Sequence, residues 1–263
     1  MIFKKLNTLR KGIQTKGFLG FFRYFLFESD NDFVGRYVEL RGNRVRIENL
    51  TISVNSPAVP RRNKSQLIQG RYEQPERNAI KTYLPRDKPV IELGGSIGVV
   101  ACMTNQLLHH PHEHVVVEAN PNMVNTLEHN RQINQCQFDI IQRAIAYDRD
   151  RVAFYQSGFS SSIVAVSEAQ IEVPTIRLGD IVATKNWQVF SLICDIEGAE
   201  VDVIAHELEL LRNRVMMIII ELHPNIVGVA TVDNMLTQLD SIGFEKVSQE
   251  NDVYVFRNTA ITA

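Results

Sequence analysis

The chain has 263 residues, of which 44% are hydrophobic and 22% are charged, and its formal net charge is −2. This length fits one large α/β domain with an N-terminal extension, or two small domains. The near-neutral charge gives no reason to expect a nucleic acid as a partner. The scattered cysteines, which are Cys102, Cys136 and Cys194, form no C-x-x-C pair and favour a cytosolic setting.

The first thirty or so residues are both basic and aromatic, with an aromatic run at Phe18–Phe27. This run is too short to span a bilayer. One interpretation is a helix that lies on an anionic membrane surface, which would make the protein membrane-peripheral. We favour a helix that packs its aromatic face onto the domain or onto a second subunit of a homo-oligomer. Its apolar residues wrap nearly all the way round instead of forming a stripe.

Residues Tyr37 to Ile52 predict a small hairpin with a turn at Gly42-Asn43. Residues Ser56 to Gly70 predict a loop. Its basic residues are expected to be solvated, with contact to an acidic substrate as the alternative; they are Arg61, Arg62 and Lys64. We divide the chain into an N-terminal extension, residues 1–69, and a main domain, residues 70–263.

From Glu73 onward, helical and strand patterns alternate along the chain. Such repeats with apolar strands predict a mostly parallel sheet with helices on both faces, closed by an antiparallel strand. Ligands bind such sheets beyond the carboxyl ends of the strands. The expected helices are 75–84, 98–108, 121–130, 199–211 and 232–242, and the expected strands are 89–93, 114–118, 140–146, 190–195, 216–222, 245–247 and 253–257.

The first of these strands ends in the sequence V-I-E-L-G-G-S-I-G, from Val90 to Gly98. Its spacing does not fit the dinucleotide-binding pattern G-x-G-x-x-G. It fits better the acid-first loop of S-adenosylmethionine (SAM) methyltransferases, with Glu92 as the acid and Ser96 at the central glycine. A strand that ends in such a turn leaves backbone N–H groups free at the start of the next helix.

The second strand ends in V-V-V-E-A-N-P, which places Glu118 where a carboxylate can accept hydrogen bonds from a ribose diol. The alternative is an ordinary acid at the entry to the helix that begins near Pro121. Ala144, at the end of the third strand, is a candidate to flank an adenine ring, and structural packing is its alternative.

The fourth strand leads into D-I-E-G-A-E, with Asp195 at its end and Glu197 two residues later. Neighbouring carboxylates repel each other unless a cation, a substrate or a proton relieves them. The next strand ends with Glu221 and His223 on the same side of the pleat. His223 is a candidate general base, or a metal ligand together with Asp195, and its alternative is to orient the loop before Pro224. Glu200 is explained by capping of the helix start.

A histidine-rich segment precedes the second strand at the opposite edge of the sheet; it contains His109, His110, His112 and His114. Without a cysteine or a paired distant site, we interpret it as a solvated loop and not as a metal site.

Taken in order, these motifs, with G-R-Y-E at Gly70–Glu73 and the later Asn130, resemble the FkbM family of SAM-dependent methyltransferases over residues 70–256. The resemblance implies a class I methyltransferase (Rossmann-like) fold and O-methylation of a sugar, glycan or natural-product hydroxyl. It carries cofactor contacts onto Glu92, Gly94, Gly98 and Glu118, and catalytic acids onto Asp195 and Glu197. The adjoining Gly95, Ser96, Ala119 and Asn120 complete the expected cofactor-binding set.

This sequence departs from the family's usual D-x-G-A-N-x-G at Glu92, Gly95 and Ser96. We expect these changes to tune the loop, with loss of activity as the alternative. A hydroxyl acceptor needs a base or a metal. The base would be His223 or Asp195; a divalent cation would be held by Asp195 and Glu197 with His223. The rival functions are a non-catalytic nucleotide-binding or scaffold protein and an NAD-dependent oxidoreductase.

Overall fold

A computed structural model of the chain describes residues 32–155 and 170–261. The basic and aromatic N-terminal segment lies outside these residues, so its membrane and packing interpretations stay predictions. Within the described residues, no helix has the length and apolar character needed to cross a bilayer.

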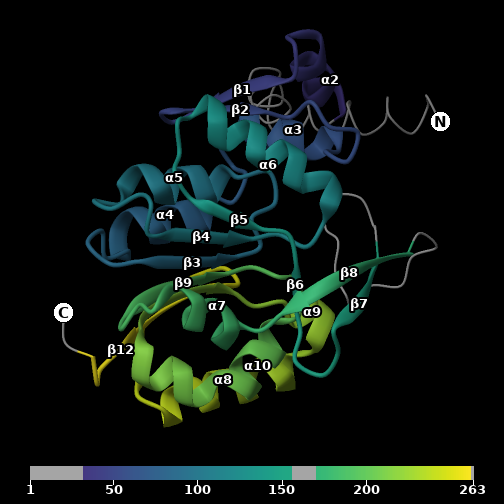
Figure 1. Cartoon of the computed structure of the whole chain (residues 1–263). Coiled ribbons are helices and arrows are strands. Elements are labelled where there is room, and N and C mark those ends of the chain that lie inside the picture. Colours follow the sequence, from purple (N-terminus) through teal and green to yellow (C-terminus); the bar gives the residue numbers. More distant parts are fainter. Residues whose placement is uncertain (1–31, 156–169, 262–263) are drawn as a thin grey trace, which may run out of the picture.

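The centre of the fold is a seven-stranded sheet with the strand order β11-β12-β10-β9-β3-β4-β5 (Figure 1). The strands from β10 to β5 run parallel, and β12 pairs antiparallel with both β10 and β11. This arrangement confirms the predicted α/β class and its antiparallel closing strand. The strand bounds are β3 Val90–Leu93, β4 His114–Val117, β5 Asp139–Ile141, β9 Phe190–Cys194, β10 Val215–Glu221, β11 Phe244–Glu250 and β12 Val253–Asn258.

Helices cover both faces of the sheet, because its central strands are apolar on both sides (Figure 1). On one face, Ile91 and Leu93 of β3 pack in a cluster with residues of three helices: α7 Leu178–Lys185, α8 Glu200–Arg214 and α10 Val229–Ser241. The other face is covered by α4 Gln74–Tyr83, α5 Val99–Leu107 and α6 Pro121–Ile133. The short helix α9 Pro224–Val227 follows β10.

The segment before α4 differs from its prediction. Asp32–Leu40 forms the helix α2, whose Val34 and Val38 are buried one turn apart, so the apolar spacing was helical and not that of a strand. The hairpin consists of β1 Arg44–Ile47 and β2 Leu50–Ser53.

The region predicted to be a loop contains the helix α3 Arg61–Ile68. Arg62 is exposed, as predicted, but the other two basic residues are not simply solvated. Lys64 is buried, and both Arg61 and Lys64 form ion pairs with Glu39 of α2. The basic spacing therefore reflects contacts between two helices, α2 and α3.

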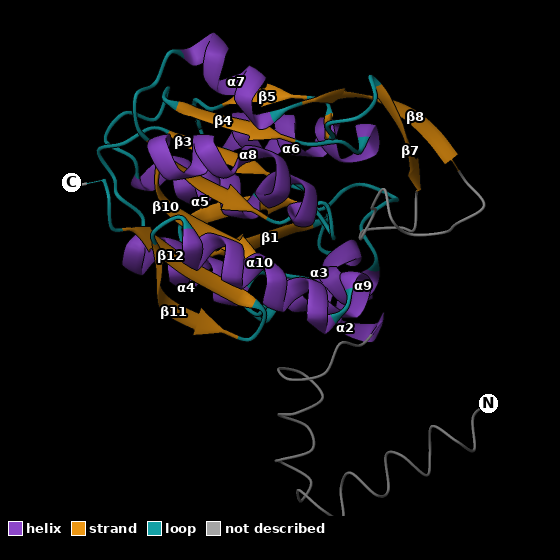
Figure 2. Ribbon diagram, turned by 90° about the horizontal axis from the view of Figure 1, so that it is seen from below, coloured by secondary structure: helices purple, strands orange, loops and turns teal. Residues whose placement is uncertain are grey.

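The predicted third strand is divided in two. β5 ends at Ile141 in the main sheet, whereas β6 Ala144–Ile145 pairs with β8 Gln170–Ile176 of a second, three-stranded sheet. The third strand of that sheet, β7 Arg151–Tyr155, pairs with β8, and Figure 2 shows both strands projecting from one side of the molecule. The strands β7 and β8 and the helix α7 were not predicted from the sequence.

The hairpin is fixed to the main domain by two asparagines of α6 and its C-cap. The buried Asn130 side chain accepts from the Ser53 N–H (2.7 Å) and donates to the carbonyls of Ser53 (3.0 Å) and Ile97 (2.8 Å). Asn134 makes the equivalent pair of bonds to Thr51, both 2.9 Å, but these are exposed. Asn130 thus connects the hairpin to the loop after β3.

We expect Asn130→Ala to lower the free energy of unfolding by about 2–4 kcal/mol, because it leaves buried backbone groups without partners. Asn134→Ala, in which water can replace the lost partner, should cost less than about 1 kcal/mol. Urea denaturation of both variants measures the difference, and equal losses would show that burial of the Asn130 bonds is unimportant.

Candidate active site

A cavity with a volume of about 390 Å³ lies at the carboxyl ends of β3, β4, β9 and β10. One half of its wall comes from the loops after β3 and β4, with Gly94, Ser96 and Glu118. The other half comes from the start of α4 and the ends of β9 and β10, with Glu76, Asp195 and Glu221. Most of the predicted site residues therefore converge on one cavity; those that do not line it are Glu92, Gly95, Gly98 and His223.

The loop after β3 is shaped by its glycines. Gly94 has φ = +97°, and a Cβ there would collide with the carbonyl oxygen of Asp195. A Cβ at Gly95 or Gly98 would collide with Leu127 of α6. Gly94 lines the cavity, whereas the other two glycines allow α6 to pack closely.

Ser96 occupies a left-handed conformation, with φ = +46°. Glycine is the usual residue at such a position, which agrees with its place at the central glycine of the acid-first loop. Its hydroxyl lies 3.3 Å from the Tyr72 hydroxyl. Left-handed non-glycine residues gather at this cavity, where they indicate a site held under backbone strain; those that line it are Glu73, Ser96, Glu197 and Asn251.

Glu118 connects the loop after β3 with the loop after β4. Its Oε2 accepts from the Ser96 N–H and its Oε1 from the Asn120 N–H, both at 2.6 Å. Burial raises the pKa of this carboxyl, while the backbone N–H groups act to lower it. A carboxylate has about four acceptor positions, so the group can still accept from a diol in the cavity. Ala119, Asn120 and Ala144 also line the wall.

Glu92 lies away from the cavity wall. Its side chain is 1% exposed and its Oε2 is 3.4 Å from Nε2 of His114, which is completely buried. Burial raises the pKa of Glu92 and lowers that of His114 to about 3. The cofactor role of Glu92 stays a prediction. The prediction of a solvated histidine segment is wrong for His114, although His109, His110 and His112 are exposed.

Glu92 and His114 should change the free energy of unfolding in opposite directions as the pH falls. In the unfolded chain His114 takes up a proton below about pH 6.5, which the folded protein resists, so this residue lowers stability on acidification. The raised pKa of Glu92 acts in the opposite direction, because the folded protein takes up this proton at a higher pH than the unfolded chain does. The two effects offset each other in the wild-type protein.

We therefore expect the Glu92→Gln variant to lose about 2–3 kcal/mol of unfolding free energy between pH 6.5 and 4.5, at roughly 1.4 kcal/mol per pH unit. The double variant with His114→Gln should lack this loss. Urea denaturation at both pH values tests it; parallel losses in the single and double variants would contradict the assignment.

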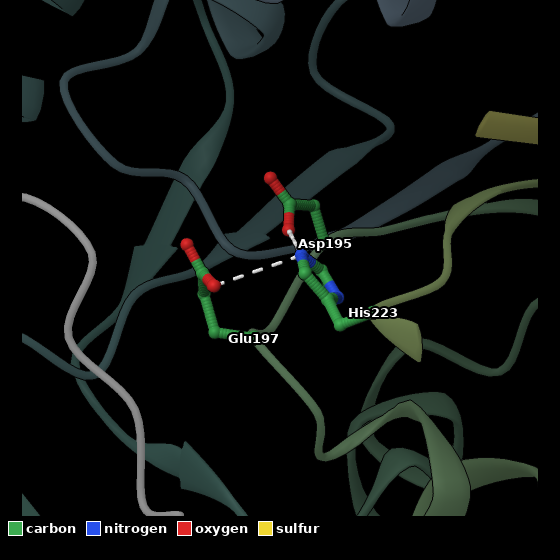
Figure 3. Close-up of side chains that lie close together, drawn as sticks. All are labelled: Asp195, Glu197 and His223. Carbon is green, nitrogen blue, oxygen red and sulfur yellow. Dashed lines mark ion pairs between the residues drawn. The ribbon is translucent and has the colours of Figure 1, made fainter. Parts of the chain in front are cut away.

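Beyond the ends of β9 and β10, the side chains of Asp195, Glu197 and His223 face one another (Figure 3). His223 Nε2 lies 3.4 Å from Asp195 Oδ1 and 3.6 Å from Glu197 Oε2, and its Nδ1 lies 3.3 Å from Glu200 Oε1. Glu200 also accepts the N–H groups of Ile196 and Gly198, at 2.7 and 2.8 Å, so it fixes the turn that presents Asp195 and Glu197.

The charges of this cluster are strongly coupled. Burial and the charge of Glu221 raise the pKa of Asp195 well above its ordinary value, against the opposing effect of His223. Burial alone would lower the pKa of His223, but contact with Glu200 and the charges of Asp195 and Glu197 raise it to about 9. At neutral pH the imidazole therefore carries its proton and pairs with carboxylates.

Two acids of the wall were not singled out from the sequence. Glu73 precedes α4 and Glu76 lies in its first turn, and both reach the cavity. Burial and neighbouring carboxylates raise the pKa of Glu73 to about 8 and that of Glu76 well above its usual range. The G-R-Y-E motif was the available signal, but nothing in its spacing indicates that α4 begins beside β9 and β10.

Residues 92–247 match the model of the methyltransferase FkbM domain. This match covers more than half of the chain. The chain belongs to the FkbM methyltransferase family. The Rossmann-like sheet with its reversed closing strand is accordingly the class I methyltransferase fold, as the motifs predicted, and the chain is a methyltransferase.

Solved structures with similar folds are distant in sequence. A putative O-methyltransferase from Klebsiella pneumoniae is 13% identical, with a TM-score of 0.45 over 71% of this chain and 80% of that one. The ribosomal protein L11 methylase of Lactobacillus delbrueckii subsp. bulgaricus is 9% identical, with a TM-score of 0.43 over 71% and 77%. The human methyltransferase 10 domain containing protein is 11% identical, with a TM-score of 0.44 over 72% and 83%. No curated protein matched the chain.

Proposed function

We propose that this FkbM methyltransferase transfers a methyl group from SAM to a hydroxyl of a sugar, glycan or natural product. The observation that carries the proposal is one cavity with two different walls: a glycine loop with a backbone-held carboxylate on one side, and a carboxylate cluster on the other. The first wall suits a nucleoside, and the second suits the activation of a hydroxyl.

The cofactor half fits SAM through residues that are already in place. Glu118 would accept from the ribose hydroxyls, and Gly94 allows the backbone to approach the ligand closely. Ala119, Ala144 and Met123 give an apolar border for the adenine. When bound, SAM supplies a methyl group on a positively charged sulfur.

The acceptor half must remove a proton, because a hydroxyl is a poor nucleophile at pH 7. Asp195 suits this role because it lines the cavity, and because a carboxylate with a raised pKa is a stronger base. His223, protonated at neutral pH, would hold Asp195 and Glu197 in position. Alignment of the acceptor hydroxyl with the methyl group of SAM would supply much of the rest of the rate acceleration.

The direct test incubates the protein with methyl-labelled SAM and a panel of glycans, glycolipids and hydroxylated natural products. We expect label on an oxygen of at least one acceptor class, and at least about 100-fold slower labelling with Asp195→Asn. Mass spectrometry locates the methyl group. Label on a nitrogen or a carbon of the acceptor would overturn the O-methylation proposal even if SAM is consumed.

A further inference from the structure

Three carboxylates from separate elements meet on the acceptor side of the cavity. Glu76 comes from the first turn of α4, Asp195 follows β9 directly, and Glu221 is the last residue of β10. One oxygen of each lies within 4.8 Å of the others. Such spacing brings the three oxygens close enough to share one ion.

Glu76 is the member of this group that most needs a positively charged partner. Its side chain is 3% exposed and lies among other carboxylates, and it makes no hydrogen bond or ion pair within the described residues. The nearby Arg77 does not neutralise it, because that guanidinium donates to the carbonyls of Gly70 and Tyr72 and pairs with Glu48. A buried carboxylate without a partner is costly, so the site favours a positively charged ligand.

We propose that Glu76, Asp195 and Glu221 bind a divalent metal ion such as Mg²⁺ or Mn²⁺. Carboxylate oxygens are the ligands that these hard cations prefer. Three ligands from the protein would leave coordination positions open toward the cavity. The ion would therefore be accessible to a second molecule that binds there.

A second group of potential ligands, Asp195, Glu197 and His223, fits an ion less well. A histidine ligand must present the lone pair of a ring nitrogen to the metal. Both ring nitrogens of His223 face carboxylates, Glu200 on one side and Asp195 and Glu197 on the other. The protonated ring therefore supplies the positive charge of its own cluster. The place left for a metal ion is the one beside Glu76 and Glu221.

The ion would bring an acceptor hydroxyl into its coordination shell and lower the pKa of that hydroxyl, so in the metal-bound protein Asp195 would not need a raised pKa to accept its proton. This consequence rests on the proposed function, whereas the binding site itself does not. The test therefore uses the metal alone, without SAM or acceptor, so that failure of the metal site and failure of methyl transfer are distinguishable.

The experiment titrates Mn²⁺ into chelator-treated full-length protein and follows free Mn²⁺ by electron paramagnetic resonance, with Mg²⁺ as competitor. We expect one site per chain. Glu76→Gln and Glu221→Gln should each weaken it by at least the roughly 10-fold that loss of even an outer-shell partner costs. Glu197→Gln, a neutralised acid of the same cavity, is the matched control and should change Mn²⁺ affinity less than either.

Thermal unfolding of each variant checks that the fold is intact. No Mn²⁺ binding by folded wild-type protein at millimolar concentration would overturn the proposal. So would a folded Glu76→Gln variant with wild-type affinity beside a Glu197→Gln variant that has lost binding, because the ion would then lie in the His223 group.

Discussion

Replacing Asp195 by asparagine is expected to lower the rate of methyl transfer by about 10²- to 10⁴-fold, the range for loss of a general base. The asparagine side chain keeps the size of the carboxylate but cannot take the proton of the acceptor. SAM affinity should stay within a few-fold of the wild type, because the contacts that we propose for SAM lie on the other wall. Steady-state kinetics and calorimetry measure the two effects separately.

The same variant should not unfold more easily in chelator-treated buffer. Asp195 lies beside Glu197 and Glu221, so removal of its charge relieves repulsion in the cluster. Asp233→Asn, the same change on the exposed surface of α10, is the control and should leave rate and affinity unchanged. An Asp195→Asn protein with wild-type turnover would remove Asp195 from the mechanism.

Replacing Glu118 by alanine should have the largest effect on cofactor binding. The change removes the acceptor that we propose for the ribose hydroxyls and also the bonds that hold the Ser96 and Asn120 N–H groups. Hydrogen bonds to charged groups contribute about 1.5–3 kcal/mol each, so loss of the ribose contact alone predicts about 10- to 100-fold weaker SAM binding. Loosening of the loop should add to this loss.

The control for this variant is Glu128→Gln on the exposed side of α6, where the carboxylate pairs with Arg131. Its SAM affinity should equal that of the wild type. Calorimetric titration of both proteins compares them directly. If a folded Glu118→Ala variant bound SAM as tightly as the wild type, the nucleoside would have to lie elsewhere in the cavity.

The sequence predicted best what directly follows a buried parallel strand. Glu118, Asp195 and His223 each come after or near the end of an apolar run, and such ends meet at one edge of the sheet. Local pattern was therefore enough to bring these residues together. The glycine loop was likewise recognisable from its sequence. Its Gly94 cannot be replaced without a collision, because a Cβ there would meet the backbone of Asp195.

The residues that were missed depend on tertiary packing. Glu76 reaches the site only because α4 packs beside β10 and β12, which its own sequence does not reveal. His114 is the first residue of β4, so the neighbouring strand buries it beside Glu92 while the histidines before it stay exposed. The end of helix α2 was mistaken for a strand, because the predicted segment began at Tyr37 and so left out Val34, which is buried one turn before Val38.

The central claim is that the cavity formed by Gly94, Ser96 and Glu118 binds SAM. Calorimetric titration of the folded protein with SAM and with NAD, side by side, tests it most directly. We predict one SAM per chain, displaced by S-adenosylhomocysteine, and no heat of binding with NAD. Binding of NAD in place of SAM, or no binding of SAM by well-folded protein, would contradict the claim.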